Sequence, residues 1–255
     1  MSLGTSDRAE REIRHGQLLA AQDTERVWGW DTPAGRLRAQ RRAALILTGA
    51  RIDPDSRVLE IGCGTGLFTE IFAATGARIV AVDISPELLA KAKLRKLPHP
   101  QVTFYEKRFE DCDVDGPFDS IIGSSILHHL DVDASIQRMK ALLKPGGRIC
   151  FAEPNMLNPQ IFLERRFRGL KIFAYTSSDE TAFVRWSLAR KLQTAGFEAI
   201  SITPFDWLHP ATPKPLIGLV QMAGKLAEGI PAVREFSGSV CISARLPLGD
   251  RLPQA

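Results

Sequence analysis

A glycine-rich segment in the first third of the chain carries the residues best suited to binding a ligand. Residues 58–61 have the pattern of a buried strand, and residues 67–71 open a helical pattern. The turn between them has glycine at alternate positions, Gly62, Gly64 and Gly66. Because glycine has no Cβ, the backbone can turn tightly there and admit a ligand against it. The first turn of the helix also offers unpaired N–H groups to an anionic or polar group.

The spacing of these glycines discriminates between classes of ligand. In a dinucleotide-binding fingerprint the third glycine follows the second by three positions, whereas Gly66 follows Gly64 by two. No Gly-Lys-Ser or Gly-Lys-Thr follows, so the turn lacks the lysine of a P-loop. Glu60 lies two positions before the first glycine of the turn, where a carboxylate suits an amino group better than a pyrophosphate. The segment therefore favours a ligand that carries an amino group.

A second acidic residue, Asp83, ends the next predicted strand, residues 77–83. In a nucleotide-binding βαβ unit an acidic residue at this place accepts hydrogen bonds from the two ribose hydroxyls, ~20 residues after the glycines. The alternative is that Asp83 caps the following helix. It is weaker, because Ser85 and Pro86 already supply a cap and a first-turn signal. Asp83 is therefore predicted to bind a ribose.

The segment Glu60-Ile61-Gly62-Cys63-Gly64-Thr65-Gly66 resembles motif I of the class I S-adenosylmethionine-dependent methyltransferases. The resemblance implies S-adenosylmethionine as the cofactor. It places Glu60 on the methionine ammonium, the glycine turn on the carboxypropyl chain and Asp83 on the ribose. The cofactor-binding residues that it implies are Glu60, Gly62, Cys63, Gly64, Gly66, Asp83, Ile84, Phe109, Glu110 and Ser125.

The expected adenine contact departs from the family pattern. Residues 107–111 stand where related enzymes often read Gly-Asp-Ala-x-Asp, but Arg108 replaces the acid that usually meets the adenine amino group. Phe109, through its backbone and packing, or Glu110 or Asp111, through its side chain, must then be considered instead. The sequence leaves these alternatives open.

Two adjacent histidines follow the fourth predicted strand, residues 118–123, whose end faces the transferred methyl in the family. An imidazole is the side chain best matched to removing a proton near neutral pH. His129 is slightly preferred to His128 as the catalytic residue in the pocket. The alternative is that the pair packs the turn and neither acts as a base. Glu153, which ends the fifth predicted strand, either contacts the acceptor or the base or has a structural role.

Composition and charge narrow the class of protein further. A chain of 255 residues, 44% of them hydrophobic, can bury a large α/β core. The four cysteines form no Cys-x-x-Cys pair, so we expect no metal site and no disulfide framework, and a cytoplasmic location fits. No apolar run reaches membrane-spanning length. The arginine clusters, at a net charge of +4, are interpreted as solvated helix faces rather than as a nucleic-acid surface.

The predicted strands alternate with predicted helices along the chain. This order favours an α/β fold with a seven-stranded, mostly parallel sheet and helices on both faces. The last strand, residues 237–245, is expected to be antiparallel, as in the class I methyltransferase fold. We expect residues 1–50 to form an N-terminal helical cap and residues 51–255 to form the S-adenosylmethionine-binding domain. An acceptor-side insertion is expected around residues 154–181.

The resemblance implies an enzyme that moves a methyl group from S-adenosylmethionine to a small-molecule acceptor, such as a sugar, a lipid or a polyketide-like compound, by direct displacement. No Asn/Asp-Pro-Pro-aromatic sequence follows the fourth strand, which argues against amino-methylating nucleic-acid enzymes. Two alternatives stay open: an RNA methyltransferase that uses the arginine clusters, and a cofactor-binding protein without transferase activity. A dinucleotide dehydrogenase is disfavoured by the glycine spacing. Nucleic acid is not an expected partner, and a homo-oligomer is left open.

Overall fold

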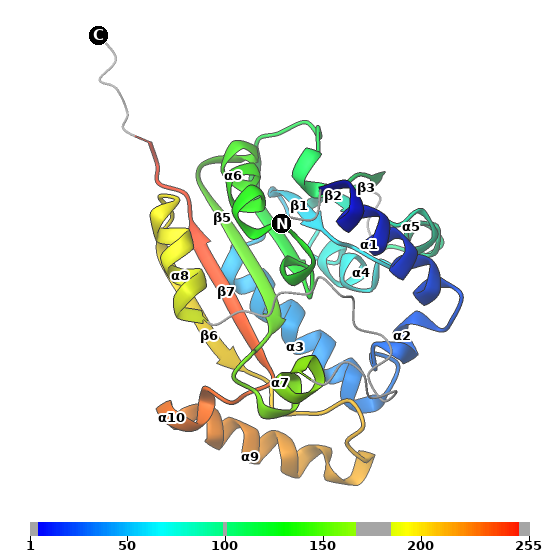
Figure 1. The fold of residues 1–255 in the computed structure, drawn as a ribbon, viewed down its shortest axis with the longest axis vertical. Coiled ribbons are helices and arrows are strands. Elements are labelled where there is room, and N and C mark those ends of the chain that lie inside the picture. The colour runs from blue at the N-terminus through cyan, green and yellow to red at the C-terminus, as the bar shows by residue number, and fades with distance from the viewer. Residues whose placement is uncertain (1–4, 99–100, 167–184, 250–255) are drawn as a thin grey trace.

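The computed structural model of the chain describes residues 5–98, 101–166 and 185–249 (Figure 1). The strands are β1 (Arg57–Ile61), β2 (Arg78–Asp83), β3 (Val102–Glu106), β4 (Phe118–Ser124), β5 (Leu143–Pro154), β6 (Glu198–Phe205) and β7 (Ser239–Arg245). The α-helices are α1 (Thr5–Ala20), α2 (Thr24–Val27), α3 (Pro33–Ala50), α4 (Leu67–Ala73), α5 (Pro86–Lys93), α6 (Val132–Leu142), α7 (Pro159–Arg166), α8 (Arg185–Thr194), α9 (Ile217–Gly229) and α10 (Pro231–Arg234). Three short 3-10 helices are η1 (Phe109–Asp111), η2 (Leu127–His129) and η4 (Lys214–Leu216).

The described strands form one sheet in the order β3-β2-β1-β4-β5-β7-β6. All neighbours from β3 to β5 are parallel, whereas β7 is antiparallel to both β5 and β6. The predicted mostly parallel sheet with an antiparallel last strand is thereby confirmed. The order reverses between β1 and β4, so the carboxyl ends of these two strands flank the crevice where open α/β sheets bind ligands.

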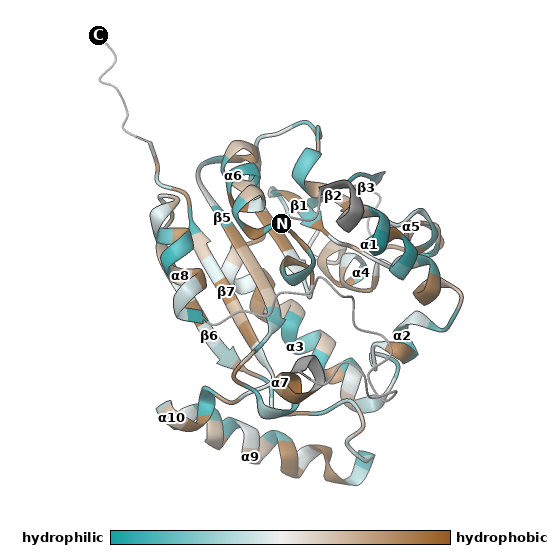
Figure 2. Cartoon of the chain, in the orientation of Figure 1, coloured by the Kyte–Doolittle hydropathy of each residue, from teal (hydrophilic) through white to brown (hydrophobic). Residues whose placement is uncertain are grey.

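Each face of the sheet is covered by its own set of helices (Figure 1). On one face Ile46 of α3, Phe72 of α4 and Leu89 of α5 pack against the strands. On the other face Met139 of α6 and Leu188 of α8 do the same. Figure 2 shows the hydrophobic colour concentrated on the inner strands, as expected for strands buried on both faces. The sheet is therefore a rigid base from which the loops at its carboxyl edge project.

Side-chain caps fix where the helices near this edge begin. Thr32 caps α3, Ser85 caps α5 and Asp131 caps α6, and each side-chain oxygen accepts a hydrogen bond from the backbone N–H three residues later. The cap on α5 is the one expected from the sequence. Asp83 is consequently not required as a helix cap, and its carboxylate is available for another role.

Some element bounds differ from those predicted. The sequence pattern predicts a helix over residues 36–49 and another from Pro86 to about residue 96. In the structure the first begins at Pro33 and the second ends at Lys93. The sequence pattern also predicts that Lys-Pro-Gly-Gly ends a helix and that the fifth strand spans residues 148–153. In the structure β5 begins at Leu143 and contains Lys-Pro-Gly-Gly. The reason is a bulge, since the pairing with β4 shifts register at this segment. Of the expected insertion at 154–181, residues 167–181 lie outside the described residues.

The helix α9 packs against the rest of the protein through only one of its sides. Ile217 and Gly224 are buried, whereas the large apolar side chains of Leu219, Met222 and Leu226 are exposed. No helix within the described ranges is long and apolar enough to cross a membrane.

The N-terminal helix α1 lies against α5 at the carboxyl edge of the sheet. Gly16 permits this close approach, because a Cβ at this position would lie 2.6 Å from the hydroxyl oxygen of Ser85. The packing brings the side chains of Glu12 and His15 over the strand ends, where they meet residues that follow β4. The first helix is therefore part of the site described below.

Candidate functional site

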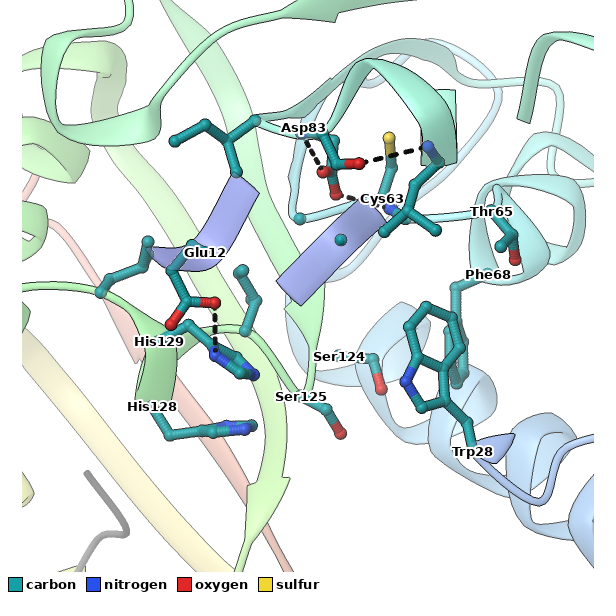
Figure 3. Close-up of a pocket in the computed structure, with 18 of the residues that line it drawn as sticks. Glu12, Trp28, Cys63, Thr65, Phe68, Asp83, Ser124, Ser125, His128 and His129 are labelled. Atoms are coloured by element: carbon teal, nitrogen blue, oxygen red, sulfur yellow. Dashed lines mark hydrogen bonds and ion pairs between the residues drawn. The ribbon is translucent and has the colours of Figure 1, made fainter. Parts of the chain in front are cut away.

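A cavity of about 490 Å³ opens at the carboxyl ends of β1, β2 and β4, beneath α1 and α3 (Figure 3). Ten of the predicted site residues line it: Gly62, Cys63, Gly64, Asp83, Ile84, Phe109, Glu110, Ser125, His128 and His129. Glu60 and Gly66 do not line it. The structure thus brings most of the predicted residues to one place, at the expected switch point of the sheet.

The glycine turn adopts the backbone conformation that its sequence indicates. Gly62, Gly64 and Gly66 have φ values of +65°, +53° and +76°, in the left-handed region that favours glycine. A Cβ on Gly62 would lie 2.3 Å from the side chain of Ile126, and one on Gly66 would meet α5. Gly62 and Gly64 both line the cavity, but a Cβ on Gly64 would meet only the ring of Trp28, which also lines it. Room for a ligand therefore explains Gly64, whereas close packing explains the other two.

Glu60 lies behind the turn, in the sheet, and is 1% exposed. Its Oε2 has no hydrogen-bond partner among the described residues. Burial, together with the smaller effect of the negative charge of Asp83, raises the pKa of Glu60 to about 8. A positive group brought to the turn would stabilise the ionised carboxylate, so the electrostatics suit an ammonium group even though Glu60 does not border the cavity.

Asp83 joins the end of β2 to the glycine turn. Its Oδ2 accepts a hydrogen bond from the N–H of Gly64 at 2.7 Å, and its Oδ1 accepts one from the N–H of Ser85 at 2.9 Å. Burial raises the pKa of Asp83, although both bonds act to lower it. A carboxylate offers about four acceptor positions, so Asp83 can still accept a hydrogen bond from a ligand in the cavity. Binding of a ribose by Asp83 stays a prediction.

Two of the three alternatives for the adenine contact line the cavity. Phe109 is buried at its wall, and Glu110 borders it while accepting a hydrogen bond from the backbone N–H of Asp131. Asp111 does not line the cavity, and its side chain is exposed. Arg108 forms ion pairs with both acids, at 3.3 Å and 3.0 Å. The geometry therefore favours Phe109 and Glu110.

His128 is paired with Glu153 through a short contact. The distance from His128 Nδ1 to Glu153 Oε2 is 2.6 Å, and Glu153 Oε1 accepts the N–H groups of Ile126 and Leu127. Burial alone would raise the pKa of Glu153, but the hydrogen bonds and the attraction of His128 outweigh it and lower the pKa. Glu153 therefore remains ionised, and the Nδ1–H of His128 donates to it. In the neutral form of an imidazole held this way, the basic lone pair belongs to Nε2.

His129, the slightly preferred histidine, contacts a different carboxylate. Its Nδ1 lies 3.1 Å from Oε2 of Glu12 on α1, an ion pair drawn in Figure 3. Its ring lies 4.2 Å from that of His128 and stacks at 6.4 Å on His15. Both histidines line the cavity, but His128 is the one fixed by a fully buried carboxylate. Glu12 and His15 were not predicted, because nothing in the pattern of α1 indicates which residues it faces.

Arg42 is a buried cation that sequence reasoning missed. It is 2% exposed and donates to the hydroxyls of Ser124, Ser125 and Ser239 and to the carbonyl of Ala152. Burial lowers its pKa to about 10, so it stays charged at neutral pH. Within the described residues no carboxylate makes a hydrogen bond to it.

The expectation that the arginines of α3 are solvated is wrong for Arg42. It shares a helix face with the buried residues Ala39, Ala43 and Ile46, at intervals of three or four positions. An arginine within a buried stripe must meet polar partners, and the missed signal was its position in this periodicity.

The sequence leaves open whether Trp28 and Trp30 form an aromatic lid or cover the core. Both line the cavity, as a lid requires. Trp28 lies over Gly64, and Trp30 packs edge to face on Phe68 with the ring centroids 5.6 Å apart. These aromatic rings form the wall between the glycine turn and α3.

Cys63 lines the cavity with a buried thiol. Burial raises its pKa well above the ordinary value, and the nearby carboxylates raise it further. The thiol is therefore uncharged and unsuited to nucleophilic attack. Among the described residues no group of three or more His, Cys, Asp and Glu side chains could hold a metal ion.

Comparison with known protein families gives a match over the part of the chain that contains the glycine turn and Asp83. Residues 59–149 match the profile of a methyltransferase domain family. This range runs from β1 into β5 and includes the glycine turn, Asp83 and both histidines. The chain is thus similar to a methyltransferase domain over residues 59–149, and its strand order is that of the class I methyltransferase fold.

Curated relatives match over part of their length. A ubiquinone biosynthesis O-methyltransferase from Xanthomonas axonopodis pv. citri is 36% identical over 135 residues. The match covers 51% of this chain and 56% of the relative. A protein of the same name from Xanthomonas campestris pv. campestris matches to the same extent. The chain therefore aligns with little more than half the length of these relatives.

Solved structures extend the likeness over nearly the whole chain. The N-methyltransferase NodS from Bradyrhizobium japonicum, crystallised with S-adenosylhomocysteine, gives a TM-score of 0.63 at 19% identity, covering 92% of this chain and 98% of that one. Magnesium protoporphyrin IX methyltransferase from Synechocystis gives 0.55 at 16% identity, covering 84% and 83%. At these identities the likeness establishes the fold.

Proposed function

We propose that this protein transfers the methyl group of S-adenosylmethionine to an oxygen of a small-molecule acceptor by direct displacement. The observation that carries the proposal is the single cavity that joins Gly64 and Asp83 to the His128–Glu153 pair. One side of the cavity suits the cofactor, and the other offers a base to an acceptor. Relatives named as ubiquinone O-methyltransferases support oxygen as the accepting atom.

The residues present fit this cofactor at three points. Glu60 has a buried oxygen without a partner among the described residues, which suits a nearby ammonium group. Asp83 retains acceptor capacity for a ribose hydroxyl. Arg42 is a buried cation that suits the cofactor's carboxylate. Phe109 and Glu110 would then hold the adenine, and the glycine turn would hold the chain between sulfur and carboxylate.

When bound, the cofactor would supply a methyl group carried on a positively charged sulfur. An acceptor oxygen would attack the methyl carbon in line, with the sulfur of S-adenosylhomocysteine as the leaving group. The protein contributes by holding the acceptor near the methyl group and by excluding water with Trp28 and Trp30. We assign removal of the hydroxyl proton to Nε2 of His128, because Glu153 holds Nδ1 and stabilises the imidazolium that forms. His129, through Glu12, positions α1 over the cavity.

The alternative functions lack comparable support. The arginines of α3 do not form a free basic face, because Arg38 and Arg41 are ion-paired and Arg42 is buried. This weakens the case for RNA as the acceptor. A purely cofactor-binding protein would not need the His128–Glu153 pair. The cytoplasmic location and a possible homo-oligomer stay predictions from the sequence.

We also propose the division into an N-terminal helical cap, residues 1–50, and a methyltransferase domain, residues 51–255. The cap supplies Glu12, Trp28 and Arg42 to the cavity, which supports assigning it to closure of the site. The acceptor-side insertion proposed around residues 154–181 contributes Ile161 to the cavity from its described part.

The decisive experiment is calorimetric titration of the purified protein with S-adenosylmethionine, S-adenosylhomocysteine and NAD. Binding of the first two without NAD is the expected result, with quenching of tryptophan fluorescence because Trp28 lies over the glycine turn. A His128→Ala variant should bind S-adenosylhomocysteine as tightly as the wild type and lose methyl transfer to hydroxylated acceptors. Binding of NAD alone would refute the cofactor assignment.

A further inference from the structure

A second arginine of α3, Arg38, borders the cavity one helical turn before Arg42. Its Nε donates to Oδ2 of Asp206 at 2.8 Å, and its side chain is 15% exposed. No residue in the described part of the chain accepts a hydrogen bond from its two terminal nitrogens. Four guanidinium N–H donors are therefore available at the wall of the cavity.

The partner of Arg38 places it in the half of the cavity away from the predicted cofactor residues. Asp206 directly follows β6, at the edge of the sheet opposite β3. Its backbone oxygen accepts the N–H of Gly238, which with Ser239 lines the cavity. Gly64 lies in the turn after β1 and Asp83 ends β2, and both strands are on the other side of β4. Arg38 thus faces the space left for the acceptor.

The guanidinium of Arg38 is held in a fixed orientation. Asp206 has a φ of +78°, an uncommon value that aspartate tolerates better than most residues. The backbone N–H of Asp206 donates to Oε1 of Glu228, which secures this conformation. On its other side Arg38 lies 5.4 Å from the ring of Trp30, within cation–π distance. A positioned guanidinium loses little entropy when it binds an oxyanion.

A purely structural ion pair does not account for this arrangement. Arg41 already joins α3 to α9, because both of its terminal nitrogens donate to the two carboxylate oxygens of Glu228. Arg41 does not line the cavity. Arg38 instead lines the cavity and uses only Nε for its ion pair. Its two terminal nitrogens, which together match a carboxylate or a phosphate, have no partner in the described part of the chain.

We propose that Arg38 is a specificity residue that binds an anionic group, a carboxylate or a phosphate, on the methyl acceptor. This inference rests on the proposed function, since it assigns the cofactor to the other half of the cavity. It predicts that acceptors are hydroxylated compounds with an acidic group, and that neutral analogues bind weakly. The charges of the hydrogen-bonded groups agree with this proposal. Within the described residues, Asp206 is the one carboxylate hydrogen-bonded to Arg38 or Arg42, so the two arginines carry an excess positive charge.

The test is calorimetric titration of the protein saturated with S-adenosylhomocysteine, using benzoate, phenyl phosphate and neutral benzyl alcohol at constant ionic strength. We expect one or both anions to bind at least about tenfold more tightly than benzyl alcohol. The better anion distinguishes a carboxylate site from a phosphate site. Arg38→Gln should remove this preference and leave the affinity for S-adenosylhomocysteine unchanged.

Arg41→Gln is the matched control, because it removes an ion pair from the same helix outside the cavity and should retain anion binding. The proposal is overturned if neither anion binds the loaded wild type, or if Arg38→Gln binds the anion as well as the wild type. Equal loss in both variants would overturn it too, since it would indicate a structural effect. Failure of S-adenosylhomocysteine to bind contradicts the proposed function instead, and titration of the free protein with the anions then decides the role of Arg38.

Discussion

Replacing Glu60 by glutamine should make the protein more stable at neutral pH. Glu60 is buried, its pKa is raised to about 8, and one of its oxygens has no partner in the described structure. In the unfolded chain the same carboxyl ionises near the reference value of 4.5. Between these two values the folded protein binds one more proton than the unfolded chain. The free energy of unfolding therefore falls as the pH rises.

The size of this effect follows from the two pKa values. Each pH unit between 4.5 and about 8 lowers the free energy of unfolding by about 1.4 kcal/mol. At pH 7 the loss amounts to about 3 kcal/mol, a large fraction of the 5–15 kcal/mol of a typical protein. Glutamine has the shape of the protonated acid and does not ionise. Glu60→Gln should therefore recover most of this loss at pH 7 and almost none below pH 4.5.

The assay is urea denaturation of the wild type and of Glu60→Gln between pH 5 and pH 8.5, followed by circular dichroism. The difference between the two proteins isolates Glu60, because Asp83 and every other titrating group are present in both. The difference in stability should widen steadily up to about pH 8 and level off above it. If the difference in unfolding free energy between the two proteins did not change with pH, the inference that the buried carboxyl is held protonated would be refuted.

Because the buried carboxyl of Glu60 lowers the stability of the protein at neutral pH, we expect it to serve in binding the cofactor. If a cofactor ammonium stabilises the ionised carboxylate, binding of S-adenosylhomocysteine near pH 7 should release a proton from Glu60. Calorimetry in buffers of different ionisation enthalpy measures this release. Glu60→Gln should bind S-adenosylhomocysteine more weakly and without that proton release, so the stabilising substitution is expected to reduce function.

Three further predictions concern the same site. Asp83→Asn should weaken binding of S-adenosylhomocysteine by about 10- to 100-fold, because charged hydrogen bonds contribute about 1.5–3 kcal/mol, whereas Asp133→Asn on α6 should leave the calorimetric affinity unchanged. Gly62→Ala should lower the free energy of unfolding by more than Gly76→Ala, since both have positive φ but only the first would place a Cβ 2.3 Å from a side chain; equal urea midpoints would contradict this. Glu153→Gln should slow methyl transfer about 100-fold and move the acidic limb of the rate profile to lower pH, while the affinity for S-adenosylhomocysteine is retained; an unmoved profile would make Glu153 purely structural.

The parts of the fold that the sequence predicts well are those encoded by neighbouring residues. The alternation of apolar strands and amphipathic helices, the cap at Ser85 and the antiparallel last strand all follow from local patterns and motif resemblance. The bulge at the start of β5 was missed, because Lys-Pro-Gly-Gly normally ends a helix and the pairing that extends the strand comes from β4.

The roles of individual side chains were harder to assign. The positions of Gly62 and Gly66 are explained by packing against Ile126 and α5 rather than by a ligand, which only the three-dimensional neighbourhood reveals. His128 and His129 look equivalent in sequence. The structure separates them, because Glu153 fixes one imidazole from within the sheet and Glu12 contacts the other from a surface helix.

By itself the sequence determined the glycine turn, the acid at the end of β2 and the family to which they point, because these features lie within one short βαβ unit. Only the tertiary structure showed which residues line the part of the cavity near α3 and β7. Arg42 and Ser239, which share a hydrogen bond, are 197 positions apart, and Arg38 and Asp206 are 168 apart. These contacts depend on how α3 packs across the sheet and on the insertion of β7 between β5 and β6. Local periodicity carries no information on such pairings. Arg42, proposed to meet the cofactor's carboxylate, and Arg38, proposed to hold the acceptor, could therefore be found only in the folded protein.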